Sequence, residues 1–91
     1  MKKAYVLSYD LKGTYGSYEK LYAFLKSQNN WWHYLASTWL IVSQKSASEL
    51  TDEIVPFINK GDRFLIVPLV SGGSGWLPSK AWDWIKKHLN E

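Results

Sequence analysis

The 91-residue sequence has no cysteine, a single methionine and no apolar run of membrane-spanning length. The lack of cysteine excludes disulfide bonds, thiolate zinc sites and cysteine nucleophiles. A membrane span needs roughly 18 or more consecutive apolar residues. The apolar stretch near the N-terminus meets polar residues already at Ser8 and Asp10, too early for a secretory signal. We therefore expect a cytoplasmic protein without membrane partners.

The sequence also lacks a strong excess of basic or acidic residues. The 11 basic and 8 acidic residues give a net charge of +3, which permits nucleic acid or a nucleotide as partner but requires neither. Aromatic residues, in contrast, are abundant at 16% of the chain, within an apolar content of 46%. This composition predicts a packed core in one domain and excludes a disordered chain.

The hydrophobic patterns predict a single α+β domain spanning residues 1–91. Strands are expected over residues 3–10, 31–36, 38–43 and 62–70, and helices over 18–28, 46–58 and 79–90, with a flexible loop at 71–78. Ser46 and Glu49 form a capping box, and Pro56 should end that helix early. This order predicts a ferredoxin-like βαββαβ sandwich with sheet order 4-1-3-2 and an additional C-terminal helix.

The first strand is apolar on both sides, so it should be central and covered twice. Pro68 places the last strand at a sheet edge. Two helices cover one face of the predicted sheet, and either the last helix or a second copy of the chain must cover the other. We favour a homodimer through this open face.

The first and third strands are expected to run parallel, and the second and fourth opposite to them, so one rim of the predicted sheet should gather polar and aromatic residues. They are Asp10, Lys12, Trp31, Trp32, Gln44, Lys45, Asp62 and Arg63. Asp10 together with Asp62, or with the Asp10 of a second subunit, would hold Mg²⁺ and activate water for phosphodiester cleavage. The simpler interpretation, which we prefer, is that Asp10 ends the strand and caps the following turn.

A binding surface is the other interpretation of this rim. Trp31 and Trp32, on opposite faces of their strand, would stack bases or pack in a core or a dimer interface. The basic residues Lys12, Lys45 and Arg63 are the candidate ligand or nucleic-acid contacts. The two histidines have no serine and aspartate beside them in the sequence pattern, so a nucleophilic triad is not expected.

Five segments of the chain, spread over residues 3–70, resemble the SinR-like proteins, a small bacterial and phage family related to the CRISPR-associated "Cas two" proteins. They are Tyr9-Asp10-Leu11, Tyr18-Glu19-Lys20-Leu21, His33-Tyr34-Leu35, Ser37-Thr38-Trp39-Leu40-Ile41 and Asp62-Arg63. The resemblance implies a ferredoxin-like fold and a homodimer. Asp10 occupies the position assigned as a metal-ligating nuclease residue in the CRISPR relatives. Those relatives carry an arginine soon afterwards, whereas this chain has Lys12-Gly13-Thr14-Tyr15-Gly16, which argues against nuclease activity.

The sequence thus favours a non-catalytic homodimeric binding module without a cofactor, set in a mobile element or a defence system. Its partner would be nucleic acid, a nucleotide or another protein. The alternative is a Mg²⁺-dependent endonuclease that uses Asp10, with Asp62 as its neighbour. A third hypothesis is a phage protein that inhibits or sequesters a component of host defence.

Overall fold

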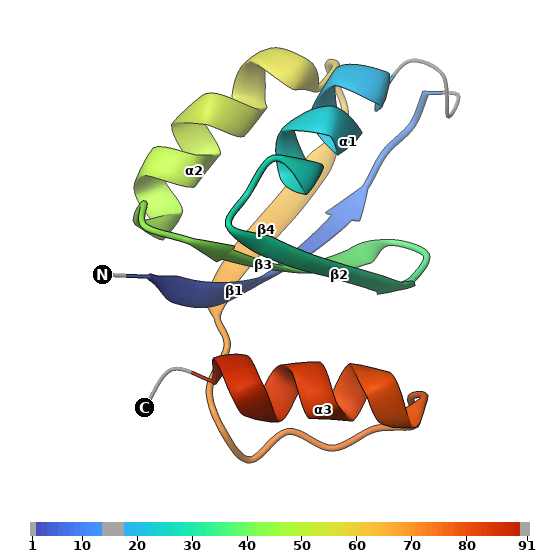
Figure 1. Ribbon diagram of the computed structural model, residues 1–91. Coiled ribbons are helices and arrows are strands. Elements are labelled where there is room, and N and C mark those ends of the chain that lie inside the picture. The colour runs from blue at the N-terminus through green and yellow to red at the C-terminus, as the bar shows by residue number, and fades with distance from the viewer. Residues whose placement is uncertain (1, 14–17, 90–91) are drawn as a thin grey trace.

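A computed structural model describes residues 2–13 and 18–89 of the chain. Four antiparallel strands form a sheet, with two helices over one face and a third helix under the other (Figure 1). The elements are β1 (Lys3–Asp10), α1 (Glu19–Lys26), β2 (Asn30–Leu35), β3 (Thr38–Ser43), α2 (Ala47–Ile54), the 3₁₀ turn η2 (Val55–Phe57), β4 (Arg63–Pro68) and α3 (Ser79–His88). Within the described part of the chain, no helix has the length and apolarity needed to cross a membrane.

The strands lie in the order β2-β3-β1-β4, so β1 is central and β4 is at an edge, as the apolar faces of β1 and the position of Pro68 predict. All three neighbouring pairs are antiparallel. The expectation that the third strand runs parallel to the first and the second opposite to it is therefore wrong, whereas the fourth strand runs opposite to the first as expected. The crossover through α1 returns the chain to the same end of the sheet, so β1 and β2 share a direction, and the tight turn after β2 then reverses β3.

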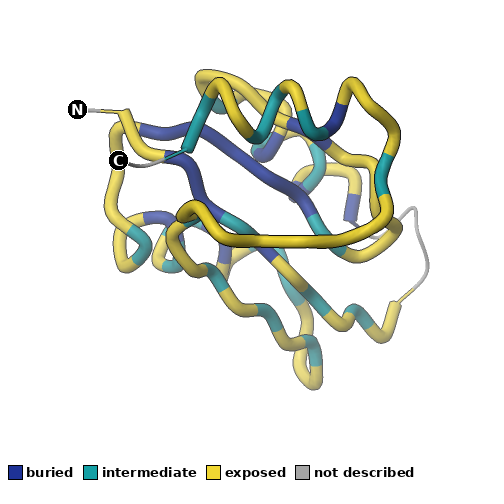
Figure 2. The backbone as a smooth tube through the Cα atoms, turned by 90° about the horizontal axis from the view of Figure 1, so that it is seen from below, coloured by how far each residue is buried: buried dark blue, intermediate teal, exposed yellow. Residues whose placement is uncertain are grey.

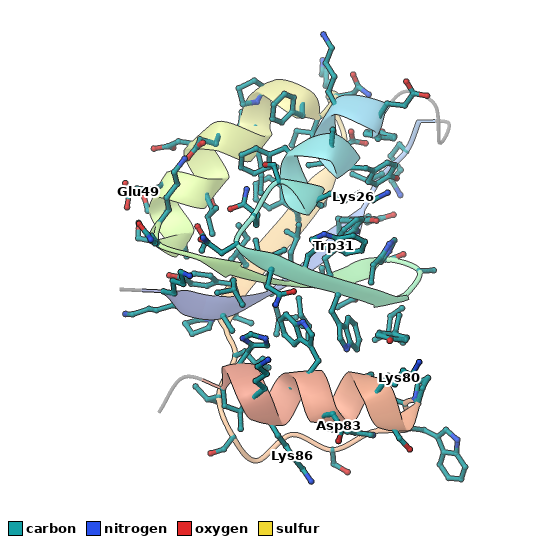
Figure 3. The ribbon with its side chains drawn as sticks, viewed as in Figure 1. Lys26, Trp31, Glu49, Lys80, Asp83 and Lys86 are labelled. Carbon is teal, nitrogen blue, oxygen red and sulfur yellow. The ribbon has the colours of Figure 1, made fainter. Side chains whose placement is uncertain are left out.

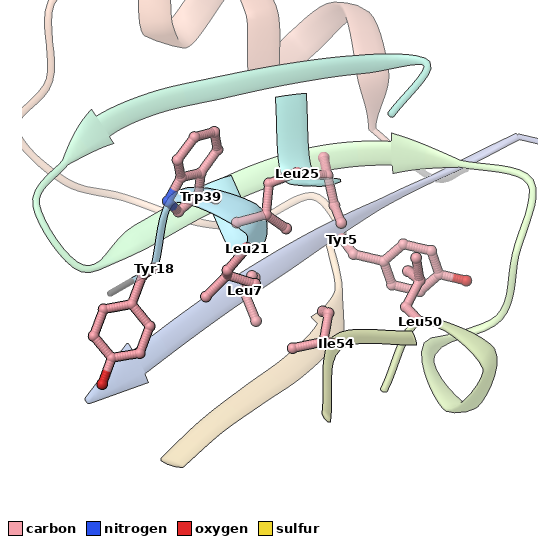
Figure 4. Close-up of a cluster of buried hydrophobic side chains, with 9 residues drawn as sticks. Tyr5, Leu7, Tyr18, Leu21, Leu25, Trp39, Leu50 and Ile54 are labelled. Atoms are coloured by element: carbon pink, nitrogen blue, oxygen red, sulfur yellow. The ribbon is translucent and has the colours of Figure 1, made fainter. Parts of the chain in front are cut away.

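The upper face of the sheet, under α1 and α2, holds the larger core (Figures 1 and 4). Its buried side chains are Tyr5, Leu7, Tyr18, Leu21, Leu25, Trp39, Ile41, Leu50 and Ile54. Leu21 and Leu25 lie one turn apart on α1, and Leu50 and Ile54 one turn apart on α2, so each helix presents one apolar stripe to the sheet.

Local signals in the sequence set the ends of α2. The Ser46 hydroxyl accepts a hydrogen bond from the Glu49 backbone N–H at 3.1 Å, and the Glu49 carboxylate accepts one from the Ser46 N–H at 3.0 Å. This confirms the predicted capping box. Pro56 lies in the turn η2, where the helix gives way to 3₁₀ geometry, because its ring cannot continue the α-helical hydrogen bonds.

The lower face of the sheet is covered by α3, the additional C-terminal helix. Trp32, Leu40 and Ala81 are buried between α3 and the strands. Viewed from this side, much of α3 and of the connection before it is exposed, with buried stretches of the strands behind them (Figure 2). Ser79 is the first helical residue, and Pro78 takes the cap position without a side-chain hydrogen bond. The chain thus covers this part of the sheet itself, where a second subunit was expected.

The cover is incomplete at the β4 edge. Leu65 and Val67 point to the same side of β4 by strand alternation and are 62% and 39% exposed. Arg63 shares that side and lies opposite Asp10 in the β1–β4 register. An apolar strip ending in one acidic and one basic residue is therefore open to solvent beside α3.

Candidate functional site

A pocket of about 320 Å³ lies beside the β2–β3 turn, between α1 and the upper face of the sheet. Its walls are mainly ring side chains, with one lysine and one aspartate. These residues are Tyr9, Tyr18, Tyr22, His33, Trp39, Lys26 and Asp10. We call this the aromatic pocket.

Trp39 is at the centre of these rings, although its side chain is buried. The His33 ring stacks on it with centroids 4.0 Å apart and planes within 15°, and the Tyr22 ring stacks at 6.1 Å and 14°. The Trp39 indole N–H donates to the Tyr9 hydroxyl at 3.0 Å. Together these contacts fix the orientation of the rings before any ligand arrives.

His33 adds a polar group to the pocket wall. Its Nε2 atom lies 3.3 Å from the backbone carbonyl oxygen of Ala36. A carbonyl oxygen only accepts, so this bond assigns the proton of the neutral ring to Nε2 and leaves Nδ1 as an acceptor. His33 is exposed as a residue, which allows a ligand to reach it.

Lys26 supplies the positive charge next to these rings. It lies above Trp31 on the α1 side of the sheet, with Nζ 5.6 Å from the centroid of the Trp31 ring (Figure 3). That distance permits a cation–π attraction, which holds the ammonium group over the sheet. The Trp31 ring in turn lies 5.4 Å from Trp39 and is 39% exposed.

Asp62 connects three segments at the same end of the sheet. Its carboxylate accepts hydrogen bonds from the backbone N–H of Lys12 at 2.8 Å, from that of Asn59 at 2.7 Å and from the Tyr18 hydroxyl at 2.8 Å. The Lys12 bond is the main cause that holds the pKa of Asp62 below its ordinary value, with smaller contributions from Asn59 and Tyr18. Both carboxylate oxygens are therefore already occupied by donors from the protein.

The Tyr18 hydroxyl also accepts a hydrogen bond from the Gly13 N–H at 2.8 Å. A Cβ atom at Gly13 would stand 2.9 Å from that hydroxyl, so the close approach requires glycine. Residues 14–17, in the stretch where the sequence departs from the family pattern, lie outside the described residues. The Asp62 connections hold the near wall of the aromatic pocket in place.

Asp10 is exposed and forms an ion pair with Lys12, whose Nζ lies 2.9 Å from its carboxylate. In the described residues no three histidine, aspartate or glutamate side chains come together in a way that could hold a metal ion. With Asp62 fully engaged by backbone and hydroxyl donors, the pair of carboxylates expected for Mg²⁺ would require those bonds to break.

The predicted rim is only half correct. Asp10, Lys12, Asp62 and Arg63 do gather at one end of the sheet. Lys45, which follows β3, lies at the opposite end and pairs with Glu53 of α2.

The two adjacent tryptophans lie on opposite faces. Trp31 is on the upper face near Lys26 (Figure 3). Trp32 is buried beneath the sheet against α3. Neither stands at the Asp10 end, because β2 begins at the other end of the sheet from β4.

Sequence reasoning missed the aromatic pocket itself. The signal was present: Tyr9 shares a strand face with Tyr5 and Leu7, and Trp39 shares one with Ile41. On α1, Tyr18 and Tyr22 lie four residues apart and so on one side of the helix. Only the antiparallel direction of β1 and β3 shows that these rings meet at one end.

Comparison of the chain with protein-family models, with curated proteins and with solved structures gave no match.

Proposed function

We propose that this protein is a non-catalytic binding module that takes one nucleotide of a single-stranded nucleic acid into the aromatic pocket. The observation that carries the proposal is a preformed pocket of about 320 Å³ whose walls are five ring side chains with Lys26 beside them. Unpaired bases bind proteins chiefly by stacking on rings, and lysines contact the adjoining phosphates.

The parts of the pocket match the parts of a nucleotide. Small-molecule sites typically have volumes of about 300–1,000 Å³, and this pocket falls at the lower end of that range. The tyrosine and histidine rings offer stacking surfaces, and His33 Nδ1 offers an acceptor for an exocyclic amino group of a base. Lys26, held over Trp31, is placed to meet a phosphate.

The proposal includes a relationship to the SinR-like family, which rests on the sequence segments that resemble that family. The order β4-β1-β3-β2, with α1 and α2 on one face, is the arrangement expected of a ferredoxin-like sandwich in the SinR-like family. The chain adds α3 to that arrangement.

Self-association of two copies is the second part of the proposal. β4 is an edge strand, and the exposed side chains of Leu65 and Val67 extend that edge as an apolar strip. Asp10 and Arg63 at the end of the strip would meet the opposite charges of a second copy related by twofold symmetry. Light scattering should give the mass of a dimer for the native chain and of a monomer for Leu65→Arg, a change at an exposed position. A native monomer at all concentrations would overturn the dimer and leave the pocket untouched.

Titration of fluorescein-labelled single-stranded RNA and DNA 12-mers, followed by anisotropy, tests the pocket. His33→Ala should weaken binding about fivefold or more, because stacking on one ring contributes roughly 1–3 kcal/mol per base. Lys26→Ala should weaken it by a similar factor, because a lysine contact to phosphate is lost. Lys80→Ala is the matched charge control, since Lys80 extends from α3 on the other side of the sheet (Figure 3). If neither oligonucleotide binds, or if Lys80→Ala weakens binding as much as Lys26→Ala, the proposal is wrong.

The same mixtures with Mg²⁺ or Mn²⁺ address the nuclease alternative. Intact oligonucleotides after prolonged incubation are expected, because the carboxylate of Asp62 is bonded to the protein and Asp10 pairs with Lys12. Metal-dependent cleavage that Asp10→Ala abolishes would replace the binding module with the nuclease.

A further inference from the structure

A second pocket lies on the opposite side of the sheet from the aromatic pocket. It has a volume of about 390 Å³ and is enclosed by the lower face of the sheet, by α3 and by the connection after β4. Apolar side chains form most of its wall. They include Val6 and Leu40 from the sheet, Leu69 and Leu77 from the connection, and Trp82 and Ile85 from α3. We call it the lower pocket.

The lower pocket has an unusual wall residue in Trp32. This residue is only 3% exposed, yet its indole Nε1–H has no hydrogen-bond partner among the described residues. Buried donors are almost always paired, because an unpaired one has lost its bonds to water without replacement. Because Trp32 lines the lower pocket, an acceptor that enters this pocket is a candidate partner for the indole N–H, which has none within the described part of the chain.

The groups around Trp32 do not supply that partner. The Tyr34 ring meets the indole nearly edge to face, with centroids 5.0 Å apart, and a ring face is at best a weak acceptor. On the sheet side of the pocket, Thr38 is the one other side chain with a hydrogen-bonding group. A buried water needs two to four polar partners, and beside Trp32 the sheet supplies only the Thr38 side chain among the described wall residues.

We propose that the lower pocket binds a small apolar molecule that carries one hydrogen-bond acceptor, such as a ketone or an ester carbonyl. The apolar body fills the space between Leu40, Leu69 and Ile85, and the carbonyl oxygen accepts the Trp32 Nε1–H. This chemistry differs from that of the aromatic pocket, whose wall includes five rings with hydroxyl, indole and imidazole groups, so the two sites take different ligands.

A pair of nearly isosteric probes isolates the carbonyl. Acetophenone and isopropylbenzene have closely similar shapes, but only acetophenone carries an acceptor. In ¹⁵N-labelled protein, each of the six tryptophans gives an indole N–H resonance. Acetophenone should move the Trp32 indole proton downfield as a hydrogen bond forms, whereas isopropylbenzene should shift the pocket methyl resonances without that downfield change. The native chain suffices for this measurement.

Trp32→Phe gives the second measurement, with Trp76→Phe as control because Trp76 is fully exposed. The affinity for acetophenone should fall about fivefold or more in Trp32→Phe, since the carbonyl then enters the pocket unpaired. The affinity for isopropylbenzene should change less than twofold, and Trp76→Phe should bind both as the native chain does. Circular dichroism checks that each variant is folded.

Two results would overturn the proposal. One is that neither probe perturbs resonances of the lower pocket at millimolar concentration. The other is that acetophenone binds there but leaves the Trp32 indole proton in place, which would assign that donor to a bound water bridging to Thr38. Neither result bears on oligonucleotide binding at the aromatic pocket, so the two proposals fail separately.

Discussion

The two faces of the sheet are closed in different ways. On the upper face, α1 and α2 bury a cluster of nine residues, and the buried polar groups there have partners, such as Trp39 with Tyr9 and Tyr18 with Asp62. On the lower face, α3 buries three residues and leaves a pocket with an unpaired indole N–H. The upper layer therefore forms the larger part of the core, and the lower layer contains a pocket that a ligand can fill.

The attachment of α3 to the sheet includes hydrogen bonds to one polar residue of β2, Asn30. Asn30 Oδ1 accepts a hydrogen bond from the Trp84 indole N–H at 3.2 Å, and its Nδ2 lies 3.3 Å from His88 Nε2. The Trp84 and His88 rings are themselves in contact, with centroids 4.4 Å apart. These bonds at the β2 edge add to the apolar contacts of α3 with Trp32 and Leu40.

Truncating one buried leucine in each layer should change the free energy of unfolding most. Leu25→Ala, in the upper core, should lower the free energy of unfolding by about 3 kcal/mol, because it leaves a closed cavity. Leu40→Ala, in the wall of the lower pocket, should cost about 1–2 kcal/mol less, because its side chain already borders open space. Urea denaturation measures both, and equal losses would show that the lower layer is packed as tightly as the upper.

The next effect concerns acid stability and Asp62. Its folded-state pKa is lowered by the hydrogen bond from the Lys12 N–H above all. A lowered carboxyl pKa stabilises the fold above the unfolded value of about 4, and this stabilisation is lost as the pH falls through the folded pKa. Asp62→Asn should be less stable at pH 7 and less sensitive to acid below pH 4 than the native chain.

Thermal unfolding at several pH values measures this difference between the two chains. Asp52→Asn, on the exposed side of α2, is the control and should follow the native curve. A native chain whose acid sensitivity matches that of Asp62→Asn would mean that the Asp62 bonds do not form in solution.

A smaller effect concerns the attachment of α3 and His88. Burial, with a lesser contribution from Lys87, lowers the pKa of His88 below its ordinary value. The neutral ring is thus favoured when α3 is in place, where Nε2 accepts from the Asn30 amide. A lowered histidine pKa gives stability that is present above the unfolded value of about 6.5 and lost as the pH falls through the folded pKa.

Hydrogen exchange therefore should show the α3 amides becoming less protected between pH 7 and pH 5, relative to the amides of α1 after correction for intrinsic rates. Lys2 and Lys3 line the same surface as His88 and add repulsion to its charged form. In His88→Gln the pH dependence of α3 should flatten. An equal change in α1 and α3 would mean that the two layers open together.

A still smaller effect is expected at Asp10, the exposed last residue of β1. Asp10→Ala removes an exposed ion pair with Lys12, so the free energy of unfolding should change by less than about 0.5 kcal/mol. Urea denaturation measures this change, and a loss above about 1 kcal/mol would show that the pair contributes more than an ordinary exposed ion pair.

Much of the fold follows from local signals that each act within a few residues. The capping box at Ser46 and Glu49, the turn around Ser37, the end of α2 at Pro56 and the edge position of the Pro68 strand are all of this kind. The α+β class follows from them. The position of the second tryptophan, Trp32, under an additional helix does not, because that depends on how far the connection after β4 reaches.

The candidate site was harder to predict because it depends on strand direction. The wrong directions of β2 and β3 placed Lys45 and the two tryptophans at the Asp10 end, and they hid the meeting of Tyr9, His33 and Trp39. Asp62 was expected as a metal ligand, whereas backbone N–H groups occupy its carboxylate. Such donors carry no signature in the sequence, since every residue except proline has one.

The connection of residues 69–78 joins the β4 edge to a helix that ends over β2, at the far edge of the sheet. It includes Gly72, whose φ of 99° is a conformation that favours glycine. The upper core contains no residue of α3, so a break in this connection would uncover the lower face of the sheet and leave the upper core intact.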